Sequence, residues 1–354
     1  MSFNISRIIV VLTLIQGLAW TALAAETRPG FYNTEVEYDQ PILNIIFSNN
    51  QLNADNSSTH NGITTKQTRN ITIGAIGLAF ASARKSSVVY TFGHHHQNTP
   101  VGNTTNTHIG LNYQLSNDMT EFGVIAENTE HPTMSDFQGL RLNASHKIEY
   151  GDGEISVYGS QSFVLNNAPH NKDGSSGSSI GLDFHFDDDR ATTTLGSKYV
   201  KNKLSSYNAT TGQTKVWWRD DTIFSGTTLR KFTNHRIGIG GHYKLTDDIG
   251  LSDQIDGRLI WVFDQPMWQT KSEVFWTQQK YKSDISNLYG DENTFGVSLR
   301  YIRQINENIS FHLDGTISKG SRASRHPDPV NATEATSKTV AHNTVISLGI
   351  IHQF

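Results

Sequence analysis

The chain has 354 residues, of which 36% are hydrophobic and 18% are charged, and it contains no cysteine. The lack of cysteine excludes disulfide bonds, cysteine nucleophiles and cysteine-based zinc or iron–sulfur sites. The formal charge of −4, from 29 basic and 33 acidic residues, is far from the basic surplus of proteins that bind nucleic acid, so nucleic acid is not an expected partner.

Residues 1–24 have the layout of a secretory signal peptide. Arg7 precedes an apolar run from Ile8 to Trp20, and the small residues Ala22 to Ala25 follow after Thr21. Because the run is too short to span a bilayer comfortably, the sequence predicts cleavage after Ala24 and export of residues 25–354. The alternative is an N-terminal anchor helix.

The start of the exported chain is its least regular part. A first strand is expected near residues 32–47, but Pro41 interrupts it and the alternation of apolar residues changes phase there. Residues 25–60 therefore have two interpretations. They hold either the first strand alone, or a periplasmic tail or plug together with the first strand.

From about residue 68 onward, apolar and polar residues alternate with a period of two, which puts alternate side chains on opposite faces of a strand. In one such run Ile109, Leu111 and Tyr113 share one face, and His108 and Asn112 lie on the other. The runs are about 9–12 residues long, which is close to what a tilted strand needs to cross a membrane. This pattern favours a barrel in a membrane over a soluble sandwich, which is the alternative.

The connections between these runs fall into two classes that alternate along the chain. Short turns such as 151–153, 246–253 and 306–308 are rich in Asp, Asn and Gly. Outer-membrane barrels show the same asymmetry of short turns and long loops, so the sequence predicts an all-β, transmembrane, antiparallel up-and-down barrel of about 14 strands, with about 12–16 allowed. The long polar stretches that alternate with the turns are 48–67, 98–104, 129–137, 165–177, 204–232, 265–292 and 319–341. Two of them, 204–232 and 265–292, have a second interpretation as long strands or an additional hairpin.

The C-terminal residues form a strand that ends on an aromatic residue, with Ile346, Leu348 and Ile350 at alternate positions before Phe354. This strand resembles the closing strand of Gram-negative outer-membrane β-barrel proteins, a porin-like class. His352 departs from the pattern, because an aromatic residue is more usual there. The resemblance implies a location in the bacterial outer membrane, contact with its lipid, and recognition of these four residues by the barrel-assembly machinery.

If the apolar face points to lipid, the opposite face lines the interior. The polar residues expected to contact a solute there are Glu127, Arg141, Asp183, His185, Arg236, Arg258 and Arg300. Their signs are mixed, which argues against strong ion selectivity. Glycines on the same face, such as Gly110 and Gly240, lower the side-chain bulk and favour a channel for small hydrophilic solutes, with a plugged bore as the alternative. The alternative for each residue is simple pairing with a neighbour across the strands.

Two other pairs of residues resemble parts of a metal site or a catalytic site, but neither pair forms a complete site. His94 and His96 share one strand face and could hold a metal ion, but no neighbouring carboxylate completes a site, so no metal and no cofactor is predicted. Asp183 and His185 could activate a water molecule, but no hydrolase motif accompanies them, so the protein is not expected to be an enzyme. An outer-membrane hydrolase, and a closed barrel whose long loops bind a surface partner, remain the alternatives. The sequence does not predict an oligomeric state.

Overall fold

The computed structural model describes residues 41–353, apart from residues 61–62, 83–87, 100–101, 116–118, 131–136, 152, 166–175, 209–212, 248–252, 284–287 and 328–333. The predicted signal peptide and residues 25–40 lie outside this described part. None of the described residues belongs to a helix long and apolar enough to cross a membrane. The described strands are β1 (Ile42–His60), β2 (Ile63–Ala81), β3 (Val88–Thr99), β4 (Gly102–Gln114), β5 (Thr120–Glu130), β6 (Phe137–Tyr150), β7 (Gly153–Val164), β8 (Ser176–Asp187), β9 (Ala191–Asn208), β10 (Gln213–Lys231), β11 (His235–Asp247), β12 (Gln254–Gln265), β13 (Trp268–Ser283), β14 (Leu288–Gln304), β15 (Ile309–Pro327) and β16 (Glu334–Gln353).

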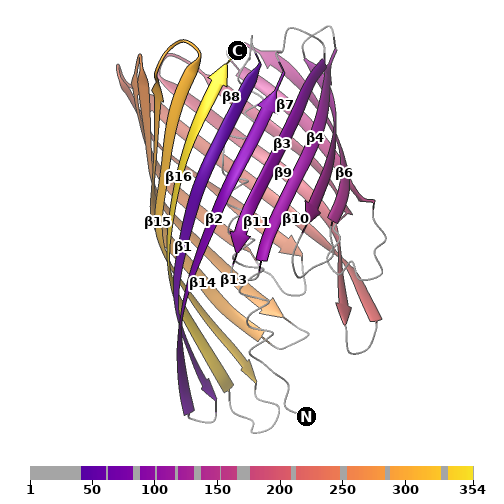
Figure 1. Ribbon diagram of the computed structural model, residues 1–354, viewed down its shortest axis with the longest axis vertical. Helices are drawn as coiled ribbons and strands as arrows, with labels where there is room; N and C mark the ends of the chain where they lie inside the picture. Colours follow the sequence, from indigo (N-terminus) through magenta and orange to yellow (C-terminus); the bar gives the residue numbers. More distant parts are fainter. Residues whose placement is uncertain are drawn as a thin grey trace. The chain divides into compact units, whose positions relative to one another are not determined.

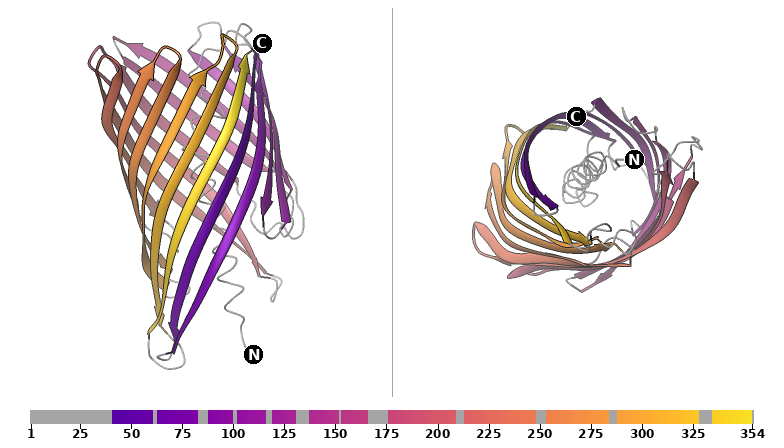
Figure 2. Two further views of the ribbon diagram at one scale, coloured as in Figure 1. Left: turned by 60° about the vertical axis from the view of Figure 1, so that its left-hand side comes forward. Right: turned by 90° about the horizontal axis from the view of Figure 1, so that it is seen from below.

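These strands form one closed antiparallel barrel (Figures 1 and 2). Each strand pairs with the strands before and after it in the chain, and β1 pairs with β16 from Ile42 opposite Gln353 to Thr59 opposite Thr336. Closure matters because inside a bilayer only a ring of strands satisfies every backbone N–H and C=O. The predicted barrel is therefore confirmed, and the C-terminal strand closes it.

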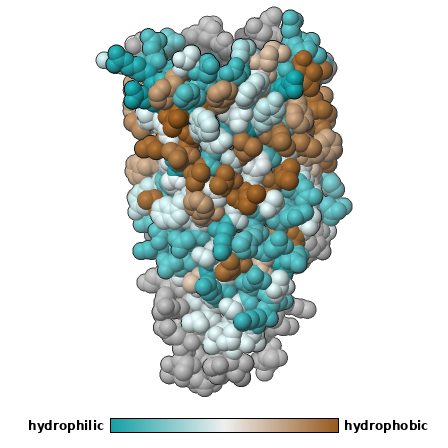
Figure 3. All heavy atoms as spheres, turned by 90° about the vertical axis from the view of Figure 1, so that its left-hand side faces the viewer, coloured by the Kyte–Doolittle hydropathy of each residue, from teal (hydrophilic) through white to brown (hydrophobic). Residues whose placement is uncertain are grey.

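The two faces of the wall differ in chemistry. In β12, Ile255, Leu259 and Trp261 are exposed on the outside, whereas Gln254 and Asp256 are buried on the inside. On the face shown in Figure 3, the outward apolar side chains gather in a belt with polar bands on both sides of it. Lipid can cover such a belt, so the outer face needs no protein core against it.

The described strands are two more than the estimate of about 14 and lie within the allowed range of about 12–16. Both additional strands come from long polar stretches whose second interpretation was long strands or an additional hairpin. β10 covers most of 204–232, and β13 covers most of 265–292. Their alternation is difficult to recognise because charged and aromatic residues are mixed on the same few positions, as in Trp268 to Trp276. The additional strand β10 also reverses the direction of the chain. β11 therefore ends at Asp247, and β12 begins at Gln254, at the end of the barrel opposite the short turns, contrary to the prediction of a short turn over 246–253.

Much of the polar sequence expected in long loops is strand as well. A belt about 25 Å tall, crossed at about 40°, needs roughly ten residues per strand. The strands β1, β2 and β15 have 19 residues each and β16 has 20, so they continue past the belt. They extend at the end opposite the short turns (Figure 1), and this end faces the outside of the cell in outer-membrane barrels.

At the other end, side chains of turn residues fix the backbone. Asp188 Oδ1 accepts hydrogen bonds from the backbone N–H groups of Ala191 and Arg190, each at 2.7 Å. These two bonds lower the pKa of the Asp188 carboxyl below its usual value. Asn306 Oδ1 accepts the N–H groups of Asn308 and Ile309 in the same way. The turn after β8 therefore favours an ionised carboxylate.

Replacing Asp188 with Asn tests this turn. Because the folded-state pKa is lowered, the ionised carboxylate contributes stability above the unfolded-state pKa of about 3.9, and this contribution is lost as the pH falls through the lower folded-state value. We expect the wild type to be more stable than D188N at pH 7, and the difference to shrink as the pH falls from about 5 towards 3. Urea unfolding midpoints in detergent would measure it. A difference that does not change with pH would contradict the assignment.

Candidate functional site: the inner wall

The seven residues predicted to line the interior all lie on the inner face of the wall. The strand register places each of them on the face opposite to the apolar belt. They are Glu127 on β5, Arg141 on β6, Asp183 and His185 on β8, Arg236 on β11, Arg258 on β12 and Arg300 on β14. They are spread around most of the ring, so they are not one compact cluster.

Three of the four arginines form ion pairs with inward carboxylates of the same or the next strand. Arg236 Nε lies 2.9 Å from an oxygen of Asp264, and Arg258 Nε lies 3.1 Å from an oxygen of Asp256. Arg300 pairs with Asp314, which stands directly opposite it on β15. For these three arginines the geometry agrees with the alternative interpretation, in which each residue pairs with a neighbouring charged residue.

On the opposite part of the wall the polar residues have other partners. Glu127 accepts a hydrogen bond from Asn106 Nδ2 at 2.7 Å, and Asp183 accepts one from the Tyr158 hydroxyl at 3.4 Å. Arg141 forms no ion pair with a carboxylate in the described part of the chain, and its residue is exposed.

The two weak chemical candidates are not assembled into sites. His185 Nδ1 hydrogen-bonds Thr194 Oγ1 at 3.1 Å instead of Asp183, so the described residues contain no Asp–His relay here. His94 and His96 face outwards, and each Nδ1 bonds a threonine of β4. Among the described residues, no group of three or more His, Asp or Glu is placed to hold a metal ion.

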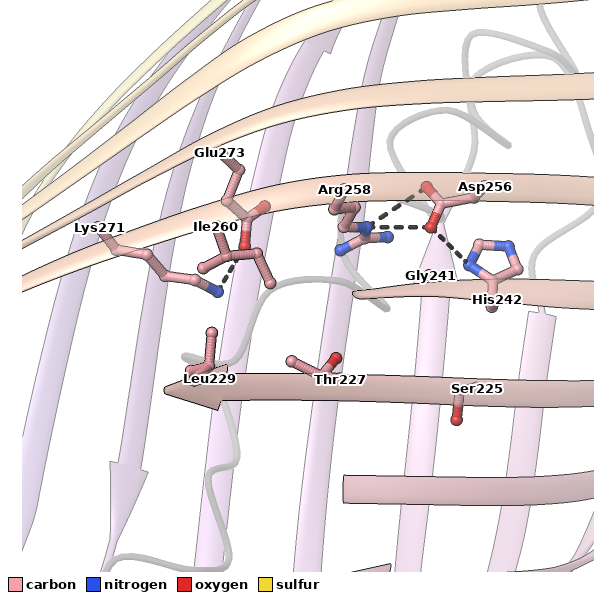
Figure 4. A pocket seen from close by; sticks show the side chains of 10 residues that line it. All are labelled: Ser225, Thr227, Leu229, Gly241, His242, Asp256, Arg258, Ile260, Lys271 and Glu273. Atoms are coloured by element: carbon pink, nitrogen blue, oxygen red, sulfur yellow. Dashed lines mark hydrogen bonds and ion pairs between the residues drawn. The ribbon is translucent and has the colours of Figure 1, made fainter. Parts of the chain in front are cut away.

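A recess of about 220 Å³ lies in the inner wall formed by β10 to β13 (Figure 4). On β11, Gly238 and Gly240 face inwards between β10 and β12 and add no side chain to this part of the wall. A Cβ atom at Gly240 would lie 2.7 Å from Thr227 Oγ1 and 3.3 Å from Gly226 O and Ile260 Cδ1, so a larger residue there would force the Thr227 side chain to shift. The lining residues are Ser225, Thr227, Leu229, Gly241, His242, Asp256, Arg258, Ile260, Lys271 and Glu273.

The charges in this recess compensate one another. Asp256 is 7% exposed, and its Oδ1 lies 3.1 Å from Arg258 Nε and 3.2 Å from His242 Nδ1. Lys271 Nζ lies 2.6 Å from Glu273 Oε1. These contacts use only Nε of the Arg258 guanidinium, so its terminal nitrogens can still donate hydrogen bonds, as can the hydroxyl of Thr227. The recess can therefore bind the hydroxyl or carboxylate groups of a small solute.

Sequence reasoning missed Lys271 and Glu273 because they lie in a stretch treated as a loop. The signal was present, since Lys271 and Glu273 alternate with Ser272 and Val274 as in the other strands. The register confirms the pattern, because Glu273 stands opposite Ile260 on the inner face of β12. Charged residues at alternate positions between two tryptophans therefore indicate a strand in this stretch.

The predicted assembly residues lie on the outside of the closing strand. Ile346, Leu348 and Ile350 are 51%, 45% and 48% exposed, and they alternate with inward residues such as Ser347. Phe354 lies outside the described residues. The outward direction of the three aliphatic residues leaves them in the apolar belt.

The closed ring, the outward belt and the polar interior define the fold of Gram-negative outer-membrane β-barrel proteins. No protein-family model matches the chain, and none of the curated proteins matches it in sequence. Among solved structures it is similar to a bacterial polysaccharide outer membrane secretin, at a TM-score of 0.50 and 9% identity, over 90% of this chain and 99% of that one. It is also similar to the outer membrane protein OpdK of Pseudomonas aeruginosa, at a TM-score of 0.49 and 10% identity, over 89% and 100%, and to OccAB4 of Acinetobacter baumannii, at 0.47 and 10%, over 88% and 99%. At such low identities the likeness establishes the fold alone, and this fold supports an outer-membrane location.

Replacing Asp256 with Asn tests the pairing in the recess. The change leaves the Arg258 guanidinium without its carboxylate in a partly desolvated wall, so we expect the free energy of unfolding to fall by about 2 kcal/mol. The double variant D256N/R258Q should lose clearly less than the sum of the two single losses, because the two residues share one interaction. Urea unfolding in detergent measures all three variants. Additive losses would show that the pair is not coupled.

Proposed function

We propose that the protein is a water-filled channel through which small polar solutes diffuse across the outer membrane. The observation that supports this most is the closed ring of sixteen strands with a polar inner face. Rings of about eight strands are filled by side chains, whereas porins of about 16–18 strands enclose an aqueous bore. The proposal involves no catalytic step, metal or cofactor.

The proposed channel distinguishes ions only weakly. Most charged side chains in the β10–β14 part of the inner wall contact a side chain of opposite charge. Examples are the pairs Arg236–Asp264, Arg258–Asp256 and Lys271–Glu273. A bore whose charges cancel locally has no dominant sign of potential along its axis. A solute would instead be selected by size and by the hydrogen bonds that it forms at places such as the recess.

The two ends of the chain carry the sequences that we expect to direct the protein to the outer membrane. We propose that residues 1–24 direct export and are removed after Ala24. We further propose that the barrel-assembly machinery recognises Ile346, Leu348, Ile350 and Phe354, and that outer-membrane lipid then covers the apolar belt. The outward, exposed positions of the three aliphatic residues support such recognition.

Single-channel recording of the refolded chain in a planar bilayer tests the proposal. We expect stable current steps and, under a tenfold KCl gradient, a reversal potential close to zero because the charges of the wall are compensated. The migration of the protein in gels with and without heating confirms that a barrel has formed. A folded barrel that inserts but never conducts would overturn the proposal.

Breaking the Lys271–Glu273 pair should change ion preference in opposite directions. E273Q leaves an uncompensated Lys271 in the bore and should shift the permeability ratio towards chloride, by roughly twofold, whereas K271Q should shift it towards potassium. Reversal potentials in the KCl gradient measure both shifts. The matched control is K319Q, because Lys319 is exposed on the outer face of β15 and should have no effect. Equal shifts in all three variants would exclude a role for the recess.

A further inference from the structure

One strand of the wall extends far beyond the neighbour that should cover its edge. β2 pairs with β1 along its whole length, from Ala81 to Ile63, but β3 pairs with β2 only from Ala81 to Gly74. Within the part of the chain that the structure describes, no strand pairs with residues 63–73 on this side. Figures 1 and 2 show the β1–β2 hairpin projecting past the end of β3.

The register identifies the backbone groups at this free edge. Ser82 N–H donates to Tyr90 O at 2.9 Å, so the even-numbered residue Ser82 directs its backbone towards β3. Backbone direction alternates along a strand, and the register of β2 against β1 is unbroken from Ala81 to Ile63. The residues that direct their N–H and C=O groups towards the free edge are therefore Thr64, Lys66, Thr68, Asn70 and Thr72, and all are exposed.

The free edge lies beyond the apolar belt. The outward residue Ile76 is 42% exposed and is followed towards the tip by Gly74, Thr72 and Asn70, so the apolar belt ends near Ile76. Proteins usually protect such edges with proline, bulges, charges or short strands. The segment 63–73 has no proline and no break in its register, and its charged residues are Lys66 and Arg69.

We propose that this free edge of β2 binds an extended, acidic segment of a soluble polypeptide by β-strand addition. Backbone donors and acceptors spaced along about 30 Å of strand recognise an extended chain whatever its sequence. The side chains add the preference for charge, because opposite charges on facing positions of paired strands stabilise the pair. A second copy of this chain is a poor occupant, since it would bring another Lys66 and Arg69 to the same short edge. This inference does not depend on the proposed channel function.

Synthetic peptides test the proposal on the full-length protein in detergent micelles. The probes are a nonapeptide of alternating threonine and glutamate, and its counterpart with lysine in place of glutamate. We expect the acidic peptide to slow amide hydrogen exchange at Thr64, Lys66, Thr68, Asn70 and Thr72 by at least tenfold, and the basic peptide to have no such effect. Odd-numbered residues already bonded to β1 should change little.

Substitutions at the edge separate backbone recognition from charge. T68P removes a central N–H that points away from β1, and should weaken binding of the acidic peptide at least tenfold, whereas the matched control T68A keeps the N–H and should bind as the wild type does. K66E should weaken the acidic peptide and improve binding of the basic one. If T68P fails to fold, K66E alone decides the question.

Channel conductance provides an independent check, because these residues lie outside the bore lining and should leave conductance unchanged. Three results would overturn the proposal. They are protection of the edge amides before any peptide is added, equal binding of the acidic peptide to T68P and T68A, and protection that rises with protein concentration alone. The last result would indicate pairing between copies of the chain.

Discussion

The need to satisfy backbone hydrogen bonds in lipid is the constraint on which this structure depends. Strands can cross a bilayer only if they close on themselves, because lipid offers no hydrogen-bond partner to an open sheet edge. The pairing of β1 with β16 achieves this closure, and it joins residues up to 311 positions apart, as in Ile42 opposite Gln353. Once the ring is closed, lipid covers one face of each strand, and the other face is available for polar chemistry.

The inner face of the wall carries many charged side chains, and most of them are neutralised by a neighbouring side chain of opposite charge. Arginines and lysines are paired with carboxylates on the same strand or on the next one, which limits the electrostatic cost of a charged wall next to low-dielectric lipid. The inward positions 238 and 240 of β11 are glycines, and the recess lined by Asp256 and Arg258 lies beside them. This part of the wall therefore combines little side-chain bulk on β11 with neutralised ion pairs.

The sequence was sufficient for the fold class because lipid-facing alternation is a local pattern, and Ile109, Leu111 and Tyr113 display it without any tertiary information. The strand number was harder, because β10 and β13 place charged residues such as Lys271 and Glu273 among tryptophans, and strand and loop then look alike in composition. The recess was not predictable, since it depends on which residues of four strands meet. Ion pairs such as Arg300 with Asp314 depend on register, which only the closed ring determines.

The unequal strand lengths give the outer rim of the described wall an uneven height. The strands β13 to β16, β1 and β2 have 16 to 20 residues, and β9 and β10 have 18 and 19. The strands β3 to β8 have 11 to 14 residues, and β11 and β12 have 13 and 12. Paired strands therefore raise the described wall in two separate stretches, and the rim is low along the two stretches between them.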